Sequence, residues 1–313
     1  MRCVFAGTPD VAAVALTRLL ESSHDVVGVL TRPDAPSGRG RAVTQSPVAA
    51  VAAEAGIAVL KPSSLRDPES LAWLRQRTPD VAPIVAYGGL VPPDALAIPA
   101  RGWVNLHFSL LPRWRGAAPV QHAIWRGDEV TGASTFLLEE GFDTGPVFGS
   151  VIEEIAPDDT SGTLLARLAA VGADLLVETL DLIARGSAAP VAQVGDVSYA
   201  PKLTVDDAAV RWDVPAFAVD RQVRACTPAP GAWTTAMGDR LGLGPVELVA
   251  GDGADALAPG EVRVGKRDVL VGTLTDPVRL GVVRASGKRE MPAADWARGI
   301  RIESGAVLGE VEA

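Results

Sequence analysis

The sequence is poor in the residues that mark secreted, membrane-spanning and metal-binding proteins. Only two of its 313 residues are cysteines, Cys3 and Cys226. A disulfide framework needs more, so a small disulfide-rich secreted fold is excluded, and each cysteine is expected to pack as a small apolar side chain. The apolar start of the chain runs straight into Thr8-Pro9-Asp10, and no apolar stretch approaches the roughly 20 residues that span a bilayer. We therefore expect a cytoplasmic protein with no membrane contact.

Histidine is equally scarce. We expect His24 to lie in a solvated turn and His122 to pack or cap within a helix. The three histidines lie far apart, and the sequence has no Cys-x-x-Cys and no helical His pair, so we expect no bound metal. The first apolar run ends in Gly7-Thr8-Pro9-Asp10 instead of a Gly-x-Gly-x-x-Gly turn, which argues against dinucleotide binding.

Positive charge is also in deficit. The chain has 29 Lys and Arg against 38 Asp and Glu, which gives a net charge of −9. The acidic surplus is spread over both halves. A protein that grips nucleic acid through its overall field would be basic, so any RNA contact must depend on a local cluster of cations.

The first half of the sequence alternates short apolar runs with segments of helical spacing. This alternation predicts an α/β fold with a doubly wound, mostly parallel Rossmann-like sheet. Asp10 is expected to cap the first helix. Strands are expected at residues 2–6, 26–30, 58–60, 81–87 and 103–108, and helices at 11–20, 48–55, 71–77 and 118–126.

The pattern changes after about residue 130. A strand pair is expected at 134–138 and 147–152, followed by a long helix over 161–184. Further along, short apolar runs at 246–249, 261–264, 269–271 and 278–283 are separated by Gly/Asp turns, which predicts a small β-rich barrel or sandwich. We therefore predict a first domain over residues 1–186, a linker over 187–205 and a C-terminal β-rich domain over 206–313.

Polar residues that could perform chemistry stand near the end of the strand expected at 103–108. Asn105 and His107 are two residues apart, so their side chains project from one face of the strand, where ligands bind in open α/β sheets. The alternative is a buried polar pair with no catalytic role. Asp143 lies between glycines and suits an ordinary turn, but its loop could also bring a carboxylate beside His107.

These three residue types together suit acyl transfer to an amine without a Ser or Cys nucleophile. Asn105 could donate a hydrogen bond to a developing oxyanion, and His107 could stabilise the same oxygen or carry a proton. Asp143 could orient the imidazole and manage protons from the attacking amine. Taken alone, the two arginines around Trp114 in the following segment could equally be a solvated loop.

That segment resembles the signature of the folate-dependent formyltransferases, above all the branch that acts on methionyl-tRNA. The signature reads Asn105-Leu-His107-Phe-Ser109-Leu-Leu-Pro112-Arg-Trp-Arg-Gly-Ala-Ala-Pro119. The similarity covers most of residues 3–205. Further matching motifs are Phe5–Asp10, Arg32-Pro33-Asp34 with Gly38-Arg39-Gly40, Val85–Gly88, Gly141–Gly145, Asp159–Leu164 and Tyr199–Leu203.

The resemblance implies a catalytic trio of Asn105, His107 and Asp143. It implies that two loops border the folate, and a C-terminal domain similar to an OB-type barrel that helps to hold tRNA. The loop residues are Ser109, Leu110, Leu111 and Pro112 in one loop and Tyr87, Gly88, Gly89 and Leu90 in the other.

The resemblance also implies contacts with the tRNA. Arg39 would reach the acceptor end from the loop over residues 31–47, with Arg41 beside it, and Lys202 would contact the backbone from the linker. The implied reaction moves the formyl group of 10-formyltetrahydrofolate to the free amino group of initiator methionyl-tRNA for translation initiation, and we expect the enzyme to act as a monomer.

Two other interpretations stay open at this point. A related folate-dependent formyltransferase acting on a purine precursor or an amino sugar would share the same trio. An RNA-binding module with an inactive α/β scaffold is the alternative from a different class, and an intact Asn105, His107 and Asp143 set argues against it.

Overall fold

The chain forms two compact units. The computed structural model describes residues 1–37, 42–249 and 257–309. Residues 1–119, 130–154 and 165–199 make up the first unit, and residues 120–129, 155–164 and 200–313 the second. The dividing lines therefore pass through the helices α5 (Pro119–Arg126) and α6 (Ser161–Ala184).

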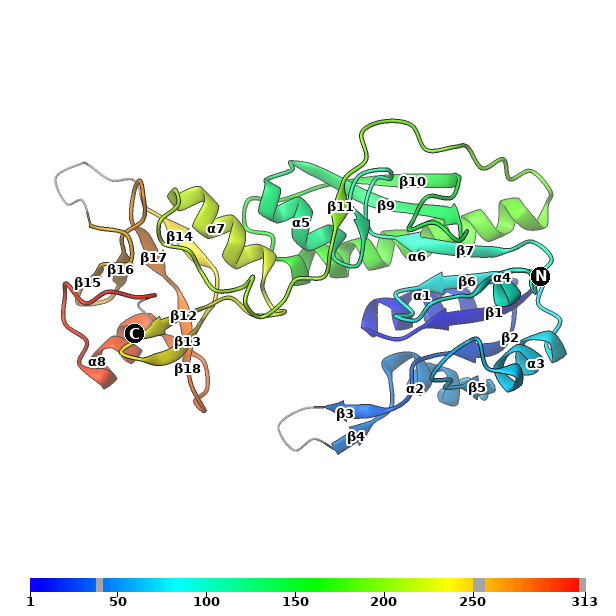
Figure 1. Cartoon of the computed structure of the whole chain (residues 1–313), viewed down its shortest axis with the longest axis horizontal. Helices are drawn as coiled ribbons and strands as arrows, with labels where there is room; N and C mark the ends of the chain where they lie inside the picture. The colour runs from blue at the N-terminus through cyan, green and yellow to red at the C-terminus, as the bar shows by residue number, and fades with distance from the viewer. Residues whose placement is uncertain (38–41, 250–256, 310–313) are drawn as a thin grey trace. The chain divides into compact units, whose positions relative to one another are not determined.

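The first unit is built on a seven-stranded, mostly parallel sheet (Figure 1). Five neighbouring strands run parallel, and β9 pairs antiparallel with β7 on one side and β10 on the other. The predicted doubly wound, mostly parallel sheet is therefore confirmed. In spatial order the strands are β10 (Val147–Glu154), β9 (Val130–Leu137), β7 (Trp103–His107), β6 (Ala82–Val85), β1 (Arg2–Gly7), β2 (Asp25–Leu30) and β5 (Val59–Leu60).

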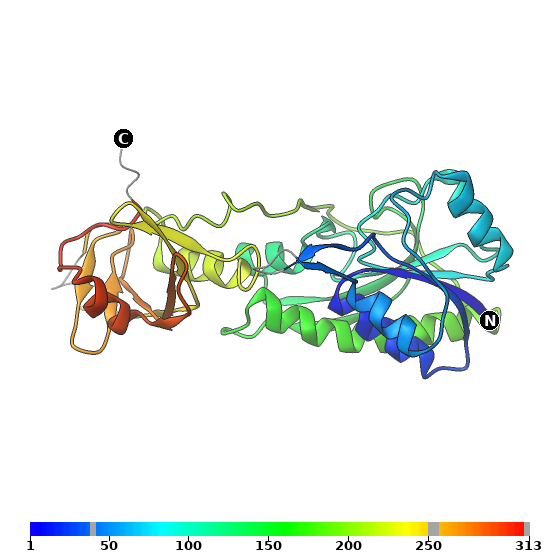
Figure 2. The same cartoon turned by 90° about the horizontal axis from the view of Figure 1, so that it is seen from below.

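Helices cover both faces of this sheet. In Figure 2 the long α6 lies on the same side as α1 (Asp10–Leu20) and α2 (Pro47–Glu54). The other face packs against α3 (Pro68–Gln76) and the short α4 (Pro93–Leu96) through a shared apolar core. That core includes Val4, Ala6, Leu30, Leu71, Leu74, Ile84, Ala95 and Trp103. Because the strands are buried on both sides, they read as nearly continuous apolar runs in the sequence.

The order of connections places a switch point between β1 and β6. The chain passes from β1 outward to β2 and β5, then returns across β1 to continue with β6 and β7. In open parallel sheets, ligands bind outside the carboxyl ends of strands beside such a point. The ends of β6 and β7 are therefore where a ligand site is expected.

Two local expectations for this unit were wrong, and one hairpin was not expected at all. Asp10 does not cap α1: the cap position is Pro9, and Asp10 is the first helical residue. His24 is not a solvated turn residue, because it is only 7% exposed and its Nε2 lies 3.2 Å from Asp181 Oδ1. The hairpin of β3 (Ala35–Ser37) and β4 (Ala42–Thr44) was not anticipated.

Beyond residue 200, the described part of the second unit contains two antiparallel four-stranded sheets and two helices, which confirms a β-rich C-terminal domain. One sheet joins β12 (Trp233–Ala236), β13 (Asp239–Leu243), β18 (Val282–Ala285) and β19 (Met291–Pro292). The other joins β14 (Val246–Leu248), β17 (Val278–Leu280), β16 (Val269–Val271) and β15 (Val262–Val264). The helices are α7 (Ala216–Ala225) and α8 (Ala293–Ile300).

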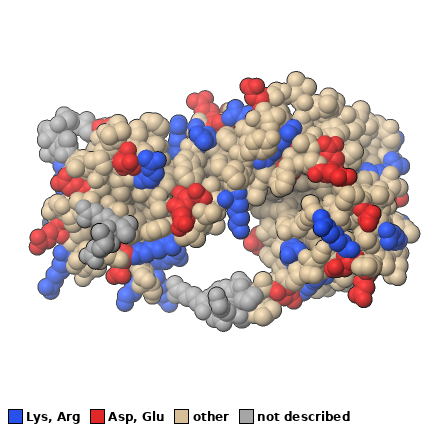
Figure 3. Space-filling view, viewed as in Figure 1, with Lys and Arg blue, Asp and Glu red and all other residues tan. Residues whose placement is uncertain are grey.

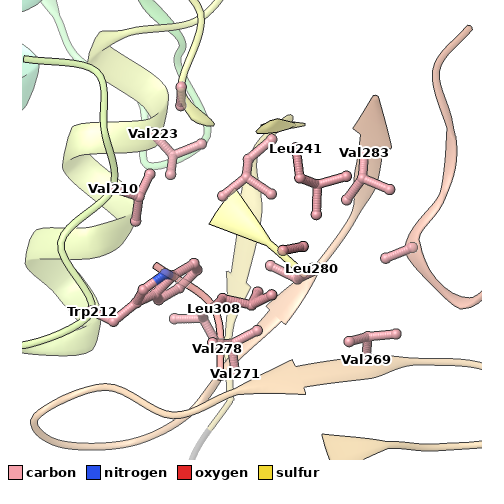
Figure 4. Packing of buried hydrophobic residues seen from close by; sticks show 14 of the residues in the cluster. Val210, Trp212, Val223, Leu241, Val269, Val271, Val278, Leu280, Val283 and Leu308 are labelled. Carbon is pink, nitrogen blue, oxygen red and sulfur yellow. The ribbon is translucent and has the colours of Figure 1, made fainter. Parts of the chain in front are cut away.

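A single apolar cluster holds these elements together (Figure 4). Side chains from both sheets meet α7 and α8 there. Trp212, from the segment before α7, also belongs to the cluster, and its indole N–H donates to Thr234 Oγ1 at 3.0 Å. Figure 4 also labels Val223, Leu241, Val269, Val278, Leu280, Val283 and Leu308 in this cluster. The run expected as one strand over 278–283 is in fact divided, because Gly281 separates β17 from β18 and each belongs to a different sheet.

Both cysteines lie in apolar surroundings, as expected. Cys3 and Cys226 are fully buried and free, and burial raises the pKa of each thiol to about 12. In the described part of the chain, no helix is long and apolar enough to cross a membrane.

Candidate active site

The first unit contains a cavity of about 730 Å³ beyond the carboxyl ends of β6 and β7. Its walls come from the loop after β6, the end of β7 and the loop after β9. Most of its lining is apolar. Asn105, His107 and Asp143, the three residues expected to be catalytic, all line it. The structure therefore brings together a strand pair and a loop residue that lie far apart in the sequence.

Asn105 and His107 owe their common direction to the two-residue period of β7. Asn105 is opposite Ile84 of β6 and Phe136 of β9, and His107 is opposite Ser134 of β9. Leu106 between them faces the opposite side, where it meets Gly172 of α6. Asn105 is half-buried, and among the described residues its side-chain amide makes no hydrogen bond to the protein. An amide held on a rigid strand and left unpaired can donate to a ligand in the cavity.

The ring of His107 is fixed by a backbone carbonyl. It is 7% exposed and meets Phe136 edge to face, with ring centroids 6.4 Å apart. His107 Nε2 lies 2.9 Å from Trp114 O. A carbonyl oxygen can only accept, so Nε2 carries the hydrogen and Nδ1 presents its lone pair when the ring is neutral. The free nitrogen is therefore placed to take up a proton.

Burial lowers the pKa of His107 below its ordinary value. The negative charge of Asp143 and the hydrogen bond to Trp114 oppose this effect without cancelling it. The side chain is consequently neutral near pH 7, with the nearby carboxylate ready to stabilise the imidazolium once Nδ1 is protonated.

Asp143 stands opposite that nitrogen on a loop of unusual backbone conformation. Its φ is +50°, a left-handed value that aspartate tolerates better than most residues. One carboxylate oxygen, Oδ2, accepts from Gly116 N at 2.7 Å and lies 3.9 Å from His107 Nδ1. Two residues on, Gly145 approaches Leu137 so closely that a side-chain Cβ would lie 1.7 Å from Leu137 O. The separation of 3.9 Å is longer than a hydrogen bond, so the carboxylate acts on the ring through charge in this arrangement.

One of the two loops expected to border a folate lines the cavity. Tyr87, Gly88, Gly89 and Leu90 all contribute to its wall, and Gly88 has a left-handed φ of +75°. Burial raises the pKa of the Tyr87 hydroxyl, and the nearby Arg32 guanidinium opposes this effect.

The other loop lies behind the wall and does not line the cavity. Ser109 is completely buried; its Oγ donates to Arg113 O at 2.6 Å, and its carbonyl accepts from Ser134 Oγ at 2.7 Å. Leu110 faces Gly132 of β9, and Leu111 N bonds Ser134 Oγ at 3.4 Å. In this arrangement the segment 109–112, which ends in Pro112, supports the end of β7. A folate contact for these residues stays a prediction.

Of the three residues expected to contact tRNA, the structure describes Lys202 alone, and Lys202 does not line this cavity. Arg39 and Arg41 fall outside the residues that the structure describes. Lys202 is exposed in the second unit. Across residues 1–37, 42–249 and 257–309, no three His, Cys, Asp or Glu side chains gather as a metal ion would require.

The sequence analysis did not identify two residues of the cavity wall, nor one residue that hydrogen-bonds the loop carrying Asp143. Leu138 and Phe142 line the cavity from the loop after β9, and Phe142 is 76% exposed at its rim. Leu138 ends the strand expected at 134–138 and Phe142 follows it, and this position could have indicated that they line the cavity. Gln193 lies in the segment assigned as a linker and gave no signal, yet its amide hydrogen-bonds the backbone of the Asp143 loop.

Known proteins resemble this sequence over nearly its whole length. The formyl transferase family matches residues 1–180, and the formyl transferase C-terminal domain matches residues 202–301. The methionyl-tRNA formyltransferase of Salinispora tropica is 62% identical over 309 residues, covering 98% of this chain and 100% of that relative. The chain belongs to the methionyl-tRNA formyltransferase family. It is therefore an enzyme, and the folate-dependent formyltransferase family inferred from the motifs is confirmed.

Two solved structures share this fold. WlaRD, a sugar 3N-formyl transferase, has a TM-score of 0.65 at 14% identity, covering 92% of this chain and 99% of its own. HypX from Aquifex aeolicus in complex with tetrahydrofolic acid has a TM-score of 0.67 at 18% identity, covering 95% of this chain and 47% of its own. At these identities the likeness extends to the fold alone.

Proposed function

We propose that this chain transfers the formyl group of 10-formyltetrahydrofolate to the α-amino group of initiator methionyl-tRNA, giving N-formylmethionyl-tRNA for translation initiation. The observation that carries the proposal is the presence of Asn105, His107 and Asp143 in one cavity of a chain 62% identical, end to end, to a methionyl-tRNA formyltransferase. Residues 1–186 would carry the chemistry, and residues 206–313, beyond the 187–205 linker, would contact tRNA. The enzyme would act as a cytoplasmic monomer and need no metal.

The reaction begins when the neutral α-amine attacks the formyl carbon of the folate. A carbon–nitrogen bond forms, the carbonyl π electrons move to oxygen, and the attacking nitrogen becomes cationic. That nitrogen must lose a proton, and N10 of the folate must gain one before the bond between N10 and the formyl carbon breaks. The products are tetrahydrofolate and the N-formyl amine, so no net proton is consumed.

Asn105 is suited to the oxyanion. Its amide projects from β7 and has no hydrogen-bond partner among the described residues, so its N–H can point at the oxygen that becomes negative. Because the strand is held between β6 and β9, the donor needs little reorganisation during the reaction.

His107 and Asp143 are suited to the proton transfers. Nδ1 of neutral His107 accepts the proton from the attacking amine, and the same proton then passes to N10 as that nitrogen departs. Asp143, 3.9 Å from Nδ1, stabilises the imidazolium that exists between the two transfers. The hydrogen bond from Nε2 to Trp114 keeps the ring in the tautomer that this role requires.

The cavity suits a folate of the 10-formyl type in size and polarity. A volume of about 730 Å³ lies within the range of roughly 300–1,000 Å³ that is usual for small-molecule sites. The Tyr87–Leu90 loop supplies part of the apolar wall. We also propose that the segment 109–112 (Ser109, Leu110, Leu111 and Pro112) borders the folate, in addition to supporting the end of β7.

The second unit offers a local cationic surface for RNA despite the acidic net charge. Figure 3 shows Lys and Arg gathered along one edge of this unit. Arg240 lies over the half-exposed ring of Trp233 at 4.4 Å, and Arg284 extends across Gly242 on the next strand. Arg240, Arg284, Lys288 and Arg289 are exposed and have no carboxylate within ion-pair distance in the described part of the chain. Unpaired cations beside an aromatic ring suit phosphates and unstacked bases. Arg39, Arg41 and Lys202 complete the proposed tRNA contacts.

The test is formyl transfer to initiator tRNA charged with methionine. Free methionine, glycinamide ribonucleotide and a nucleotide-linked amino sugar serve as competing acceptors, and labelled formyl is followed in each. We expect transfer to methionyl-tRNA alone. Transfer to one of the other acceptors, with none to methionyl-tRNA, would replace this proposal by the related formyltransferase.

A further inference from the structure

Residues 191–199 form an extended segment of the first unit, here called the strap, whose side chains hydrogen-bond the backbone at Trp114 and in the Asp143 loop. At one end Val191 and Val147 exchange two backbone hydrogen bonds of 2.8 Å each. At the other end Arg115 N, in β8 (Arg115–Gly116), donates to Ser198 O at 2.9 Å. The strap is therefore fixed at one end to β10 of the main sheet and at the other end to β8, which forms a separate two-stranded sheet with β11 (Tyr199–Ala200).

Between those ends the side chains of the strap face solvent, with two exceptions. Val191, Val194, Val197 and Tyr199 are between 47% and 86% exposed. Only Gln193 and Ser198 are partly buried. These two side chains turn inward, and each binds the backbone of a segment that holds a catalytic residue.

Gln193 holds the Asp143 loop. Its Nε2 donates to Asp143 O and Gly145 O, both at 2.8 Å. Its Oε1 accepts from Arg115 Nη2 at 2.7 Å and from Nε at 3.2 Å. Arg115 directly precedes Gly116, whose N–H bonds the Asp143 carboxylate. One amide thus joins the two chain segments that determine where Asp143 points.

Ser198 holds the segment that binds His107. Its Oγ accepts from Trp114 N at 2.9 Å, and Trp114 has a left-handed φ of +59° that a tryptophan does not adopt readily. The carbonyl of the same residue accepts the hydrogen of His107 Nε2. Ser198 therefore helps to fix the acceptor that determines the tautomer and ring orientation of His107.

We propose that the strap sets the separation of His107 from Asp143, with Gln193 as the main positioning residue and Ser198 as a second. The inference rests on the proposed function. The Asp143 loop needs such a restraint because residues 139–142 are exposed, so apolar packing does little to hold Asp143 in its left-handed conformation. Among the described residues, Gln193 is the one side chain that hydrogen-bonds the backbone at both 143 and 145. A reacting group displaced by about 1 Å can cost about 100-fold in rate.

The decisive variant is Gln193→Glu. It keeps the shape of the side chain and the acceptor for Arg115, but it replaces the donor that faces Asp143 O and Gly145 O with an oxygen. Gln193→Ala removes both connections. Val194→Ala is the matched control, because Val194 is the neighbouring side chain of the strap and is 86% exposed. Ser198→Ala removes only the Oγ acceptor and leaves the backbone bonds of residue 198 in place.

Each full-length variant is assayed with charged initiator tRNA and 10-formyltetrahydrofolate, and its thermal midpoint is recorded. We expect kcat to fall at least about tenfold in Gln193→Glu and Gln193→Ala, and about threefold in Ser198→Ala, in line with modest displacement of the reacting groups. Both KM values should stay within about threefold, because the strap does not line the cavity. Val194→Ala should match the unaltered enzyme.

The pH profile separates positioning from a general loss of stability. A displaced Asp143 no longer raises the pKa of His107, so the acid limb of kcat/KM should move to lower pH in Gln193→Ala. The shift should be smaller in Gln193→Glu, because the new carboxylate adds a negative charge near the same loop. A lower folded fraction would reduce the rate at every pH without moving the limb. If Gln193→Ala is too unstable to assay, the same shift is sought in Ser198→Ala.

The outcomes are distinct. Absence of transfer by the unaltered chain would refute the proposed function itself. An active unaltered chain, together with a kcat within twofold in Gln193→Glu and an unmoved acid limb in Gln193→Ala, would overturn the positioning role alone. An unmoved limb in Ser198→Ala would do the same where Gln193→Ala cannot be measured.

Discussion

Replacing Asp143 with Asn tests the charge that faces His107. The amide has the same shape and can still accept from Gly116 N through its oxygen, so the loop should keep its conformation. What disappears is a negative charge 3.9 Å from His107 Nδ1, in a pair whose side chains are only 8% and 14% exposed.

The magnitude follows from that distance. Two unit charges 3.9 Å apart at an effective dielectric constant of about 20 attract by about 4 kcal/mol, or about three powers of ten in rate. Residual solvent screening reduces this value, so we expect kcat to fall about 100- to 1,000-fold. The imidazolium is formed only after the amine attacks, so the loss should appear in kcat with both KM values nearly unchanged.

The assay is single-turnover and steady-state formyl transfer to methionyl-tRNA over a range of pH. Glu178→Gln is the control, because it removes one exposed carboxylate from α6 that does not line the cavity. Thermal midpoints of the two variants should agree within a few degrees. An Asp143→Asn enzyme that keeps more than a third of normal kcat would refute the proposed part of this carboxylate in the proton transfers.

Three further predictions concern the same chemistry and the RNA surface. Asn105→Ala should lower kcat about 100-fold or more through loss of an oxyanion donor, and an unchanged rate in a folded variant would contradict that role. Burial lowers the pKa of His107, so this side chain stays neutral below about pH 6.5, the usual pKa of histidine. The acid limb of kcat/KM should therefore lie below that pH, and a limb above it would contradict the assigned protonation state. Arg240→Ala should weaken tRNA binding and reduce the slope of log affinity against log salt by about 1, with folate affinity unchanged, whereas an unaltered slope would remove this residue from the phosphate contacts.

The parallel sheet was predictable because its strands are buried on both faces. Continuous apolar runs such as those of β1 and β7 have few alternatives once helical segments separate them. Segments without that signal were missed. The helices α7 and α8 lie among short strands, and each has a proline at its N-cap position and no side-chain cap. The run at 278–283 could not reveal that its two halves join different sheets, because that depends on how the sheets pack and not on apolar content.

His24 shows the same limit for polar residues. Its Ser-Ser-His-Asp surroundings are typical of a solvated turn, but the ring is buried beside Asp181 of α6 and the chain's amino terminus. Burial and the nearby ammonium group lower the pKa of His24, although Asp181 opposes them. No local pattern could have predicted this, since Asp181 lies at the far end of the first unit's sequence.

The sequence by itself determined the chemistry available to this protein. Asn105 and His107 share a face because a strand repeats every two residues, and the surrounding motifs identified the family that the full-length comparison confirmed. Only the tertiary structure decided how those groups act together. It placed the Asp143 carboxylate 3.9 Å from Nδ1, gave His107 its tautomer through Trp114, and turned Gln193 inward to hold the loop. These are contacts between segments distant in the chain, and they depend on where loops meet in space, which local side-chain preferences do not specify.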